Sequence, residues 1–570
     1  MRPLLAATLV ATLTAAAGLA EAKTYYVDAQ TGADTNDGSV AKPWKSLKHL
    51  FDQNKIESRN WASLPYASGA QLAARNAGAL LKAGDTIVVA DGFYGELSFT
   101  GYYNASDITI AAAPSAKPRL SRVVVTSSSN WHIKGFDVSP AHAASSSRAA
   151  IVAVESHNYS GPTSKVTVEG CTISTIADIS AWSANDWDTK AANGISASGS
   201  EITLRDNLVR NINFGISVGA SKSLVIGNTV ENFSGDGLRG LGDYTVFENN
   251  TVRNCYDVND NHDDGFQSWS RGSDGKVGTG TVTGVVLRGN RIINYTDPNQ
   301  KLRCTLQGIG MFDGTFVDWV IENNVIITDH WHGISVYGAK NVRIVNNTVL
   351  DPNNSTPGPP WIRITNHKNG TAPQGCVVRN NLATDFSSAA SGVTEDHNIK
   401  ITDPSKLFVD VANYDVRLLP TAAAIDQGAA QYAPATDILG VARPQGAGVD
   451  VGAYEYSTTP PPPPPPAPDA TVDSTSPSAD SGASSDTIAP APDAGTSDDT
   501  LTAPASDSTA TGDTATAPNN SNNNNNNNGG EMKGGCNTSG APISNGLPAL
   551  PLLLLWGHSM LRKRSRSKRS

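Results

Sequence analysis

Short apolar segments and polar turns alternate at a nearly constant interval between residues 195 and 382. Each interval holds an apolar strand, a turn with asparagine, a second short strand, another turn, and a third strand that begins with glycine. Intervals without insertions are 21 to 23 residues long, as Asn207 to Asn228 and Asn324 to Asn347 show. One such interval cannot bury its own apolar face, so the intervals must stack as a solenoid. The pattern predicts an all-β, right-handed parallel β-helix.

The turns and strand starts predict which residues stack on one another. Val and Ile dominate the alternate positions, as strands packed inside a parallel sheet require. The turn asparagines should form a hydrogen-bonded ladder, and asparagine tolerates the left-handed conformation of such turns. The turns are Asp206-Asn207, Gly227-Asn228, Asn249-Asn250, Gly289-Asn290, Asn323-Asn324, Asn346-Asn347 and Asn380-Asn381, and the glycine starts are Gly194, Gly215, Gly237, Gly265, Gly308 and Gly333.

The lengths of the intervals show which face of the predicted β-helix carries insertions. From the asparagine turn to the next glycine, plain intervals take 8 or 9 residues, whereas Asn250 to Gly265 takes 15 and Asn290 to Gly308 takes 18. A third lengthening lies at the same corner if Trp361 to Arg363 is the next third strand. On the other side of the third strand, residues 271–281 form another loop. Insertions on one face usually line the binding groove, so we expect the functional site there.

Aligning the glycine starts brings polar residues of neighbouring intervals together. Asp236, Asp264, Gln307 and His332, each just before a glycine, should form one row with a spacing of about 4.8 Å. Arg239 and Gln267 should lie beside this row, with His262 and Asp263 at its lip. Two carboxylates one interval apart repel each other unless one has a raised pKa or a cation lies between them. The alternative is a solvated turn at residues 262–264 and an ordinary turn histidine at 332.

Aromatic residues fall in the same region. Their flat apolar rings with a polar edge suit the faces of sugar rings. The alternative is that each ring packs its own loop. They are Trp269, Phe312, Trp331, Tyr337 and Trp361, with Trp182 and Trp187 in an earlier loop.

Composition divides the chain further. Arg2, the apolar stretch to Leu19, and Ala20-Glu21-Ala22 predict a signal peptide over residues 1–22. We expect the β-helix over 23–403 and a closing module over 404–456. The Pro-, Ser-, Thr-, Asp- and Asn-rich segment 457–533 has little to bury and reads as a disordered tether. Residues 534–570 hold a Gly-Cys element, an apolar segment and an Arg-rich tail. We therefore expect a secreted protein anchored to a membrane.

Charge and cysteines limit the partners. The net charge is −10 and no basic stripe is present, which argues against nucleic acid because phosphate binding needs clustered Lys and Arg. Cys171, Cys255, Cys304 and Cys376 allow up to two disulfides, with the pairing open. We expect a monomer without an organic cofactor.

Two resemblances add to this interpretation. Tyr25-Tyr26-Val27, Asn36-Asp37-Gly38, Pro43-Trp44 and Asp91-Gly92-Phe93-Tyr94 resemble the N-terminal cap and first coil of pectate-lyase-like β-helix proteins. The C-terminus resembles myxobacterial surface-sorting signals, which implies that Cys536 is a processing and lipid-attachment site at the surface of a bacterial outer membrane. The first resemblance implies an enzyme acting on an acidic polysaccharide.

Our leading hypothesis is β-elimination at a uronate, which needs a base and a group that neutralises the carboxylate. His262 or His332 is the candidate base, and Arg239, Arg271 or Arg363 the candidate clamp. By resemblance to this family, Asp236, Asp263 and Asp264 are candidate Ca²⁺ ligands. Gln267, Trp269, Gln307, Trp331 and Tyr337 complete the expected substrate-binding set.

Three alternatives stay open. Polygalacturonases carry, in order, acidic motifs, a Gly-His-Gly and an Arg-Ile-Lys. This chain resembles that order with Asp236, residues 262–265, residues 331–335 and Arg363-Ile364-Thr365. The resemblance implies an inverting hydrolase as an alternative. An additional interval with Gln307 and the replacement of Lys by Thr365 depart from that pattern. C5-epimerisation is a variant of the first chemistry. A noncatalytic glycan-binding surface protein is the third alternative.

Overall fold

The computed structural model describes residues 21–143, 147–354, 356–388 and 391–459. Most of the predicted signal peptide and tether, and the whole segment 534–570 with Cys536, lie outside these residues. No helix within the described ranges is long and apolar enough to cross a membrane.

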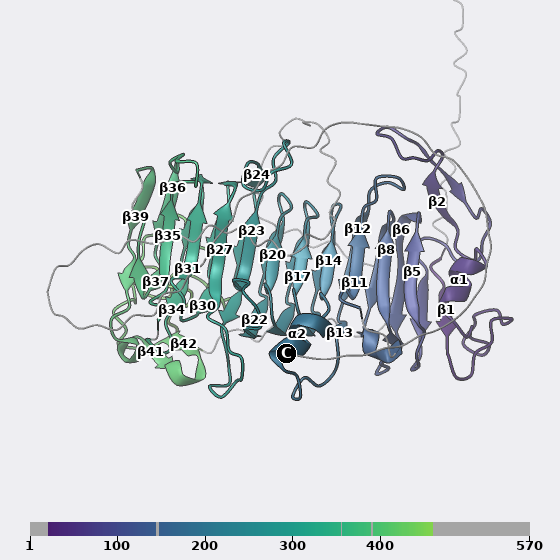
Figure 1. The fold of residues 1–570 in the computed structure, drawn as a ribbon, viewed down its shortest axis with the longest axis horizontal. Helices are drawn as coiled ribbons and strands as arrows, with labels where there is room; N and C mark the ends of the chain where they lie inside the picture. The colour runs from purple at the N-terminus through teal and green to yellow at the C-terminus, as the bar shows by residue number, and fades with distance from the viewer. Residues whose placement is uncertain (1–20, 144–146, 355, 389–390, 460–570) are drawn as a thin grey trace, which may run out of the picture. The chain divides into compact units, whose positions relative to one another are not determined.

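The described residues form a right-handed parallel β-helix, as predicted (Figure 1). Three long parallel sheets line it, and the chain passes through all three in each coil. The first sheet contains β1 (Thr24–Val27), β4 (Thr86–Val89), β6 (Tyr103–Ala112), β9 (Ser129–Lys134), β12 (Ser164–Glu169), β15 (Thr203–Arg205), β18 (Leu224–Ile226), β21 (Val246–Glu248), β25 (Val286–Arg288), β29 (Val320–Glu322), β33 (Arg343–Val345), β36 (Cys376–Arg379) and β39 (Val393–Asp396).

The other two long sheets have 11 strands each. The second sheet contains β7 (Arg119–Leu120), β10 (Asp137–Val138), β13 (Thr172–Ser174), β16 (Leu208–Ile212), β19 (Thr229–Phe233), β22 (Thr251–Cys255), β26 (Arg291–Ile293), β30 (Val325–Ile327), β34 (Thr348–Leu350), β37 (Leu382–Ala383) and β40 (Ile399–Lys400). The third sheet contains β5 (Glu96–Thr100), β8 (Arg122–Thr126), β11 (Val152–Glu155), β14 (Ile195–Ala197), β17 (Ile216–Val218), β20 (Leu238–Gly240), β23 (Asp264–Trp269), β27 (Gln307–Asp313), β31 (His332–Tyr337), β35 (Trp361–Thr365) and β38 (Asp385–Phe386).

Smaller elements decorate this framework. A short parallel sheet beside the third sheet contains β24 (Thr281–Thr283), β28 (Thr315–Val317) and β32 (Ala339–Lys340). Two antiparallel pairs are β2 (Ser58–Trp61) with β3 (Leu72–Arg75), and β41 (Phe408–Asp410) with β42 (Asp415–Leu418). The helices are α1 (Lys48–Asp52) and α2 (Ala184–Lys190), with 3₁₀ turns at Pro140–Ala143, Pro404–Lys406 and Val411–Asn413.

The asparagine ladder is confirmed. Each ladder asparagine donates from Nδ2 to the Oδ1 of the asparagine in the next coil, at 2.9 to 3.0 Å. The residue before it adopts the left-handed conformation, as at Asn323 with φ 54°. The ladder runs from Asn207 to Asn381 as predicted and continues to Asn398. These buried amides therefore satisfy one another and fix the register of the coils.

The glycines that begin the third strands are required by close contact rather than by an unusual φ. A Cβ on Gly215 would lie 2.2 Å from the carbonyl oxygen of Gly237 and 2.7 Å from Cγ1 of Val230. Gly308 has the same surroundings, with the Gly333 oxygen at 2.2 Å. This glycine column lets the backbone turn tightly from the second sheet into the third, directly beside the polar row.

Apolar side chains from all three sheets fill the interior along the stack of coils. A second apolar cluster joins the last coils to residues 407–454. There Arg443 and Glu455, both almost fully buried, form an ion pair at 2.9 Å. The guanidinium of Arg291 also binds the hydroxyl of Tyr454 at 2.6 Å, which ties this segment to the second sheet.

Candidate active site

The outer face of the third sheet carries the predicted rows of polar residues. Strand pairing aligns Asp264 with Gln307. From one coil to the next, it also aligns Arg239, Gln267, Gly310, Ser335 and Arg363, in that order. We call these last five residues the outer row. We call Asp236, Asp264, Gln307 and His332, which precede the glycine column, the rim row. The register predicted from the sequence is thus the register observed.

One wall of this face consists of the insertions at the corner between the second and third sheets. The disulfide Cys255–Cys304 joins the end of β22, where the loop before β23 begins, to the loop before β27. Trp187 of α2 stacks on Tyr256 with ring centroids 4.5 Å apart. Asn353, in the loop before β35, donates to the Tyr295 hydroxyl at 3.0 Å. The insertions therefore pack together into one wall, as their common position in the sequence predicted.

The opposite wall consists of the loop after β23, the short sheet and the loop after β35. His367 Nε2 lies 3.0 Å from the carbonyl oxygen of Gly278, and Lys368 pairs with Asp313 at 3.0 Å. Arg271, a candidate clamp, lies exposed in this wall and donates to the Gly275 oxygen of its own loop at 2.8 Å. The structure does not bring Arg271 to either row.

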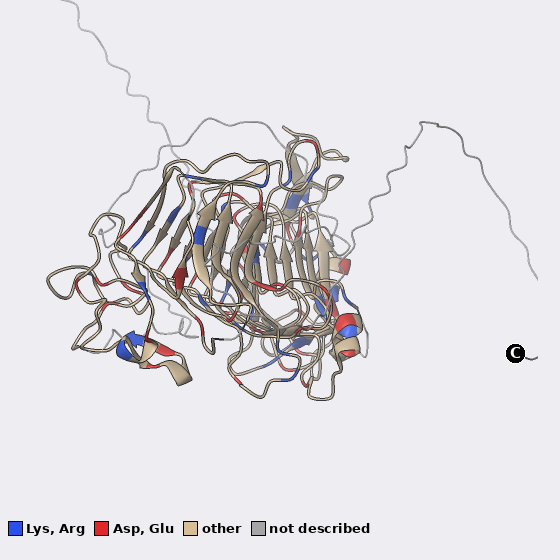
Figure 2. Cartoon of the chain, turned by 60° about the vertical axis from the view of Figure 1, so that its left-hand side comes forward, with Lys and Arg blue, Asp and Glu red and all other residues tan. Residues whose placement is uncertain are grey.

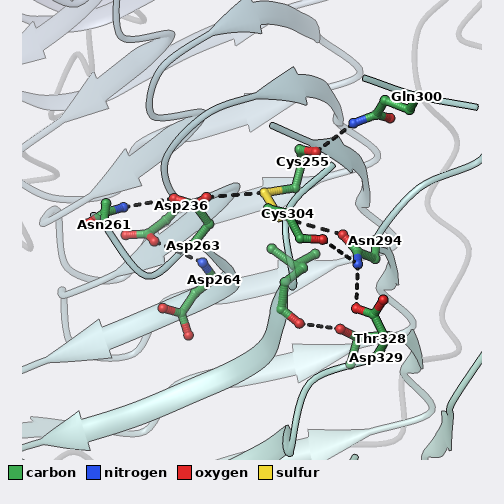
Figure 3. The surroundings of a disulfide bond; sticks show 11 residues. Asp236, Cys255, Asn261, Asp263, Asp264, Asn294, Gln300, Cys304, Thr328 and Asp329 are labelled. Atoms are coloured by element: carbon green, nitrogen blue, oxygen red, sulfur yellow. Dashed lines mark hydrogen bonds between the residues drawn. A yellow bond between two sulfur atoms is a disulfide. The ribbon is translucent and has the colours of Figure 1, made fainter. Parts of the chain in front are cut away.

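Asp263 faces away from the rows, toward the disulfide (Figure 3). Its Oδ2 lies 3.4 Å from Cys255 Sγ, and its Oδ1 accepts a hydrogen bond from Asn261 at 2.9 Å. Burial raises its pKa well above the ordinary value, and nearby Asp236 and Asp264 raise it further. Consecutive residues of an extended chain point to opposite sides, which separates Asp263 from Asp264.

The three candidate calcium ligands do not form a common site. In the described part of the chain, only Cys255, Asp263 and Cys304 bring three metal-ligating atoms within 4.8 Å of one another. Two of those atoms are the bonded sulfurs of the disulfide. The oxygens of Asp236, Asp263 and Asp264 therefore do not form one cluster of possible metal ligands among the described residues.

The disulfide should contribute to the stability of the fold. Of the four cysteines, Cys171 and Cys376 are free and buried, so one disulfide forms among the described residues rather than two. The closed loop spans 49 residues, and opening it should cost about 4 kcal/mol of unfolding free energy. We expect the Cys255→Ser, Cys304→Ser double variant to lose this amount in urea unfolding. Cys376→Ser, which removes no cross-link, is the control, and equal losses in both variants would contradict the prediction.

Asp236 and Arg239 neutralise each other in the floor of the site. Arg239 Nε donates to Asp236 Oδ2 at 2.6 Å, and the backbone amide of Asp264 donates to Oδ1 at 3.1 Å. The guanidinium lies 3.5 Å from the ring centroid of Phe214 and 5.2 Å from that of Trp269. Arg239 is thus held rigidly, with its charge compensated.

Asp264 and His262 form a buried acid–histidine pair. Asp264 is fully buried, and its Oδ2 accepts from His262 Nδ1 at 3.1 Å and from Gln267 Nε2 at 3.2 Å. Its Oδ1 is buried and has no hydrogen-bond partner among the residues that the structure describes. The His262 side chain remains 40% exposed. The imidazole is therefore anchored through Nδ1, while part of the ring is open to solvent.

Both members of this pair have raised pKa values. The hydrogen bond with Asp264, followed by the charges of Asp264, Asp236 and Asp263, raises the pKa of His262 to about 9. Burial raises the pKa of Asp264 to about 7, and the hydrogen bond from His262 opposes this rise. Such shifts are common where a protein positions a base, because they arise from burial next to a specific partner.

His332 lies in an aromatic cluster. Its ring contacts Phe312 edge to face at 4.8 Å, His330 at 5.2 Å and Trp361 at 5.5 Å between centroids. Burial, then the charges of His330, Arg363 and His262, lower the pKa of His332 to about 3. His332 is therefore neutral at neutral pH.

Arg363 is a cation of the third sheet without a carboxylate partner among the described residues. Its guanidinium lies 5.6 Å from the Tyr337 ring and 5.4 Å from the Trp361 ring. Within the described ranges its buried Nε has no hydrogen-bond partner, and no ion pair of Arg363 with a carboxylate is present. Basic and acidic residues are interspersed elsewhere on the β-helix (Figure 2).

The remaining predicted residues take different positions. Trp331 is 39% exposed and stacks nearly parallel on Trp361 at 6.4 Å, so it offers a free ring face. Tyr337 is buried and packs against Phe312 at 5.3 Å. Gln307 is buried, and its Oε1 has no hydrogen-bond partner.

Sequence reasoning gave no role to His330 or Phe214. His330 precedes His332 by two residues and stacks on it. The two histidines are separated only by Trp331 in the sequence, which could have indicated that they lie together. Phe214 occupies the rim position one coil before Asp236, and a ring there gives Arg239 its platform. The contacts of His330 with His332 and of Phe214 with Arg239 place both residues within the site.

A family model agrees with the fold. The family model described as right handed beta helix region matches residues 121–269 and 193–382. No curated protein matches the chain. Among solved structures, a pectate lyase is 15% identical, with 77% of this chain and 98% of that chain covered and a TM-score of 0.39. The mannuronan C-5 epimerase of Azotobacter vinelandii is also 15% identical, with 55% and 82% covered and a TM-score of 0.36. A rhamnogalacturonan lyase is 15% identical, with 70% and 96% covered and a TM-score of 0.35.

Proposed function

We propose that the outer face of the third sheet binds an acidic polysaccharide and cleaves it by β-elimination. The observation that carries the proposal is the pair formed by Asp264 and His262, a fully buried carboxylate that orients a half-exposed imidazole. Such a pair presents Nε2 of the histidine as a proton acceptor, because Nδ1 is engaged by the carboxylate. The third sheet also carries Arg363, whose buried Nε has no hydrogen-bond partner in the described part of the chain.

The chemistry assigns a task to each group. Neutral His262 takes the proton from the carbon next to the uronate carboxylate. The electron pair of that C–H bond becomes the new C=C bond, the adjacent C–O bond to the next sugar breaks, and the leaving oxygen takes a proton from water. Arg363 neutralises the carboxylate, whose charge grows as the proton leaves. Both His262 and Arg363 lower the pKa of His332, whose strand β31 lies between β23 and β35 in the third sheet.

Other groups suit binding. The exposed face of Trp331 offers a stacking surface for a sugar ring. Arg239 is already paired with Asp236, so it suits sugar hydroxyls better than a carboxylate. Gln267 touches Asp264 and lies between Arg239 and Gly310 in the outer row. This division favours Arg363 over Arg239 and Arg271 as the carboxylate clamp.

Acid-catalysed hydrolysis is the second candidate. It is favoured by one observation, the raised pKa of Asp264, which would let this carboxyl serve as a general acid near neutral pH. Its complete burial favours the orienting role instead.

The pH dependence separates the two candidates. For elimination, the active form has ionised Asp264 and neutral His262, so kcat/KM should rise with pH up to about 9, the pKa of His262. For hydrolysis with Asp264 as the acid, kcat/KM should fall above about 7 as this carboxyl ionises. In Asp264→Asn the main cause of the raised His262 pKa is removed, and the ascending limb should move toward the ordinary histidine value of about 6.5. Initial rates between pH 5 and 10 measure both effects, and a wild-type rate that falls above 7 would overturn the elimination proposal.

The ends of the chain suggest where the enzyme works. The predicted signal peptide at 1–22, the tether and the Gly-Cys and Arg-rich elements around Cys536 support display of a monomeric enzyme on a bacterial surface, anchored in the outer membrane. An acidic polysaccharide outside the cell would be accessible there.

A further inference from the structure

The hydroxyl of Ser335 connects two groups of the aromatic cluster. Trp361 Nε1 donates to Ser335 Oγ at 3.0 Å, and Ser335 Oγ lies 2.8 Å from His332 Nδ1. Ser335 belongs to the outer row, yet it is fully buried beneath these two side chains. Substrate therefore cannot contact Ser335 directly, and its effect must pass through His332.

The proton positions in this chain of groups follow from what each can donate. The indole N–H of Trp361 is a donor only, so Ser335 Oγ accepts there. The Ser335 hydroxyl then has its own proton to place in a buried environment, where an unmade hydrogen bond is costly. Within the described residues, His332 Nδ1 is the acceptor within reach. Ser335 must therefore donate to Nδ1, which leaves the proton of the neutral imidazole on Nε2.

We propose that the relay from Trp361 through Ser335 holds His332 in the Nε2–H tautomer, so that His332 is a hydrogen-bond donor toward the substrate and not its base. Ser335 is the positioning residue of this device. The inference about the tautomer rests on the hydrogen-bond geometry alone, whereas the role toward substrate rests on the proposed elimination. There the fixed N–H would stabilise the negative charge that develops on the uronate carboxylate as His262 removes the proton.

Burial keeps this donor neutral over a wide pH range. Phe312, Trp361 and His330 surround the ring, and the positive groups Arg363 and His262 disfavour a second proton on it. The acidic groups Asp264 and Asp236 act on His262 instead. The two histidines are thereby assigned opposite tasks, with His262 as acceptor and His332 as donor.

The test is ¹⁵N NMR of the full-length protein with labelled histidine imidazoles, with the His332 signals assigned by their loss in His332→Gln. We expect a pyrrole-type shift for Nε2 and a pyridine-type shift for Nδ1, unchanged between pH 5 and 9. In Ser335→Ala the preference should weaken toward a mixture, and Trp361→Phe, which keeps a ring but removes the indole N–H, should weaken it in the same direction. An Nδ1–H tautomer in the wild type, or an unchanged Nε2–H tautomer in both variants, would overturn the relay.

Kinetics tests the role toward substrate separately. With acidic polysaccharide, kcat of Ser335→Ala should fall roughly ten- to a hundredfold, because a misplaced donor weakens transition-state stabilisation. KM should change less, and Ser335→Thr, which retains a hydroxyl, should recover part of the loss. Unchanged kcat in Ser335→Ala would overturn the donor role. If no polysaccharide is cleaved by the wild type, the proposed function fails, while the NMR result still decides the relay.

Discussion

Replacing His262 by alanine should lower kcat on an acidic polysaccharide by about 10²- to 10⁴-fold, the usual range for loss of a general base. The imidazole is half exposed and its Nδ1 binds the buried Asp264, so the change removes the proton acceptor without opening the core. The initial rate of double-bond formation at pH 9 measures the effect. Free imidazole added to His262→Ala should restore part of the rate.

The control for this experiment is His397→Ala. His397 is also about half exposed and also pairs with a carboxylate, that of Asp396, but it lies in the turn before β40 and outside the site. Its loss should leave kcat unchanged. Equal rates in the wild type and His262→Ala, with both proteins folded, would remove His262 from the mechanism.

Replacing Asn324 by alanine should destabilise the β-helix by roughly 4 kcal/mol or more. Its Nδ2 donates to the Leu287 oxygen and to Asn347 Oδ1, and its Oδ1 accepts from the backbone and side-chain nitrogens of Asn290, all at 2.9 to 3.0 Å. The substitution leaves several buried polar groups unpaired, and each costs about 1–3 kcal/mol. Chemical denaturation of the purified variant measures the loss.

Asn213→Ala is the matched control. Asn213 is partly buried, and among the described residues its side chain makes one long hydrogen bond, from Nδ2 to Asn193 Oδ1 at 3.4 Å, so its loss should cost less than about 1 kcal/mol. If the two variants lost similar stability, the ladder would not be the element that holds the coils in register.

The sequence was sufficient for the fold because the coil repeats. Asn207 and Asn228 recur at the coil length and need each other's amides once buried, so periodicity and chemistry predict the same ladder. The column of glycines set the register of the third sheet, which correctly aligned Asp264 with Gln307. These features depend on one coil and its neighbour, and both are visible in the chain.

The details of the site depend on the directions in which side chains point, and the repeat in the sequence does not predict these directions. Asp263 and Asp264 are adjacent in sequence, but one contacts the disulfide and the other contacts His262, so the two carboxylates do not converge. Arg271 turns back onto its own loop. Ser335 is covered because the side chains of His332 and Trp361, which are paired across β31 and β35, both reach its hydroxyl. Side-chain directions decided each of these outcomes.

The most direct test of the proposed elimination follows two products at once. The purified protein is incubated with alginate, pectate and glycosaminoglycan at pH 9, and absorbance of the unsaturated uronate is recorded together with the release of reducing ends. We predict that both signals rise in equal amounts on at least one substrate and that both vanish in His262→Ala. Reducing ends without absorbance would show hydrolysis, and binding without either signal would show a glycan-binding protein; each result would contradict the proposal.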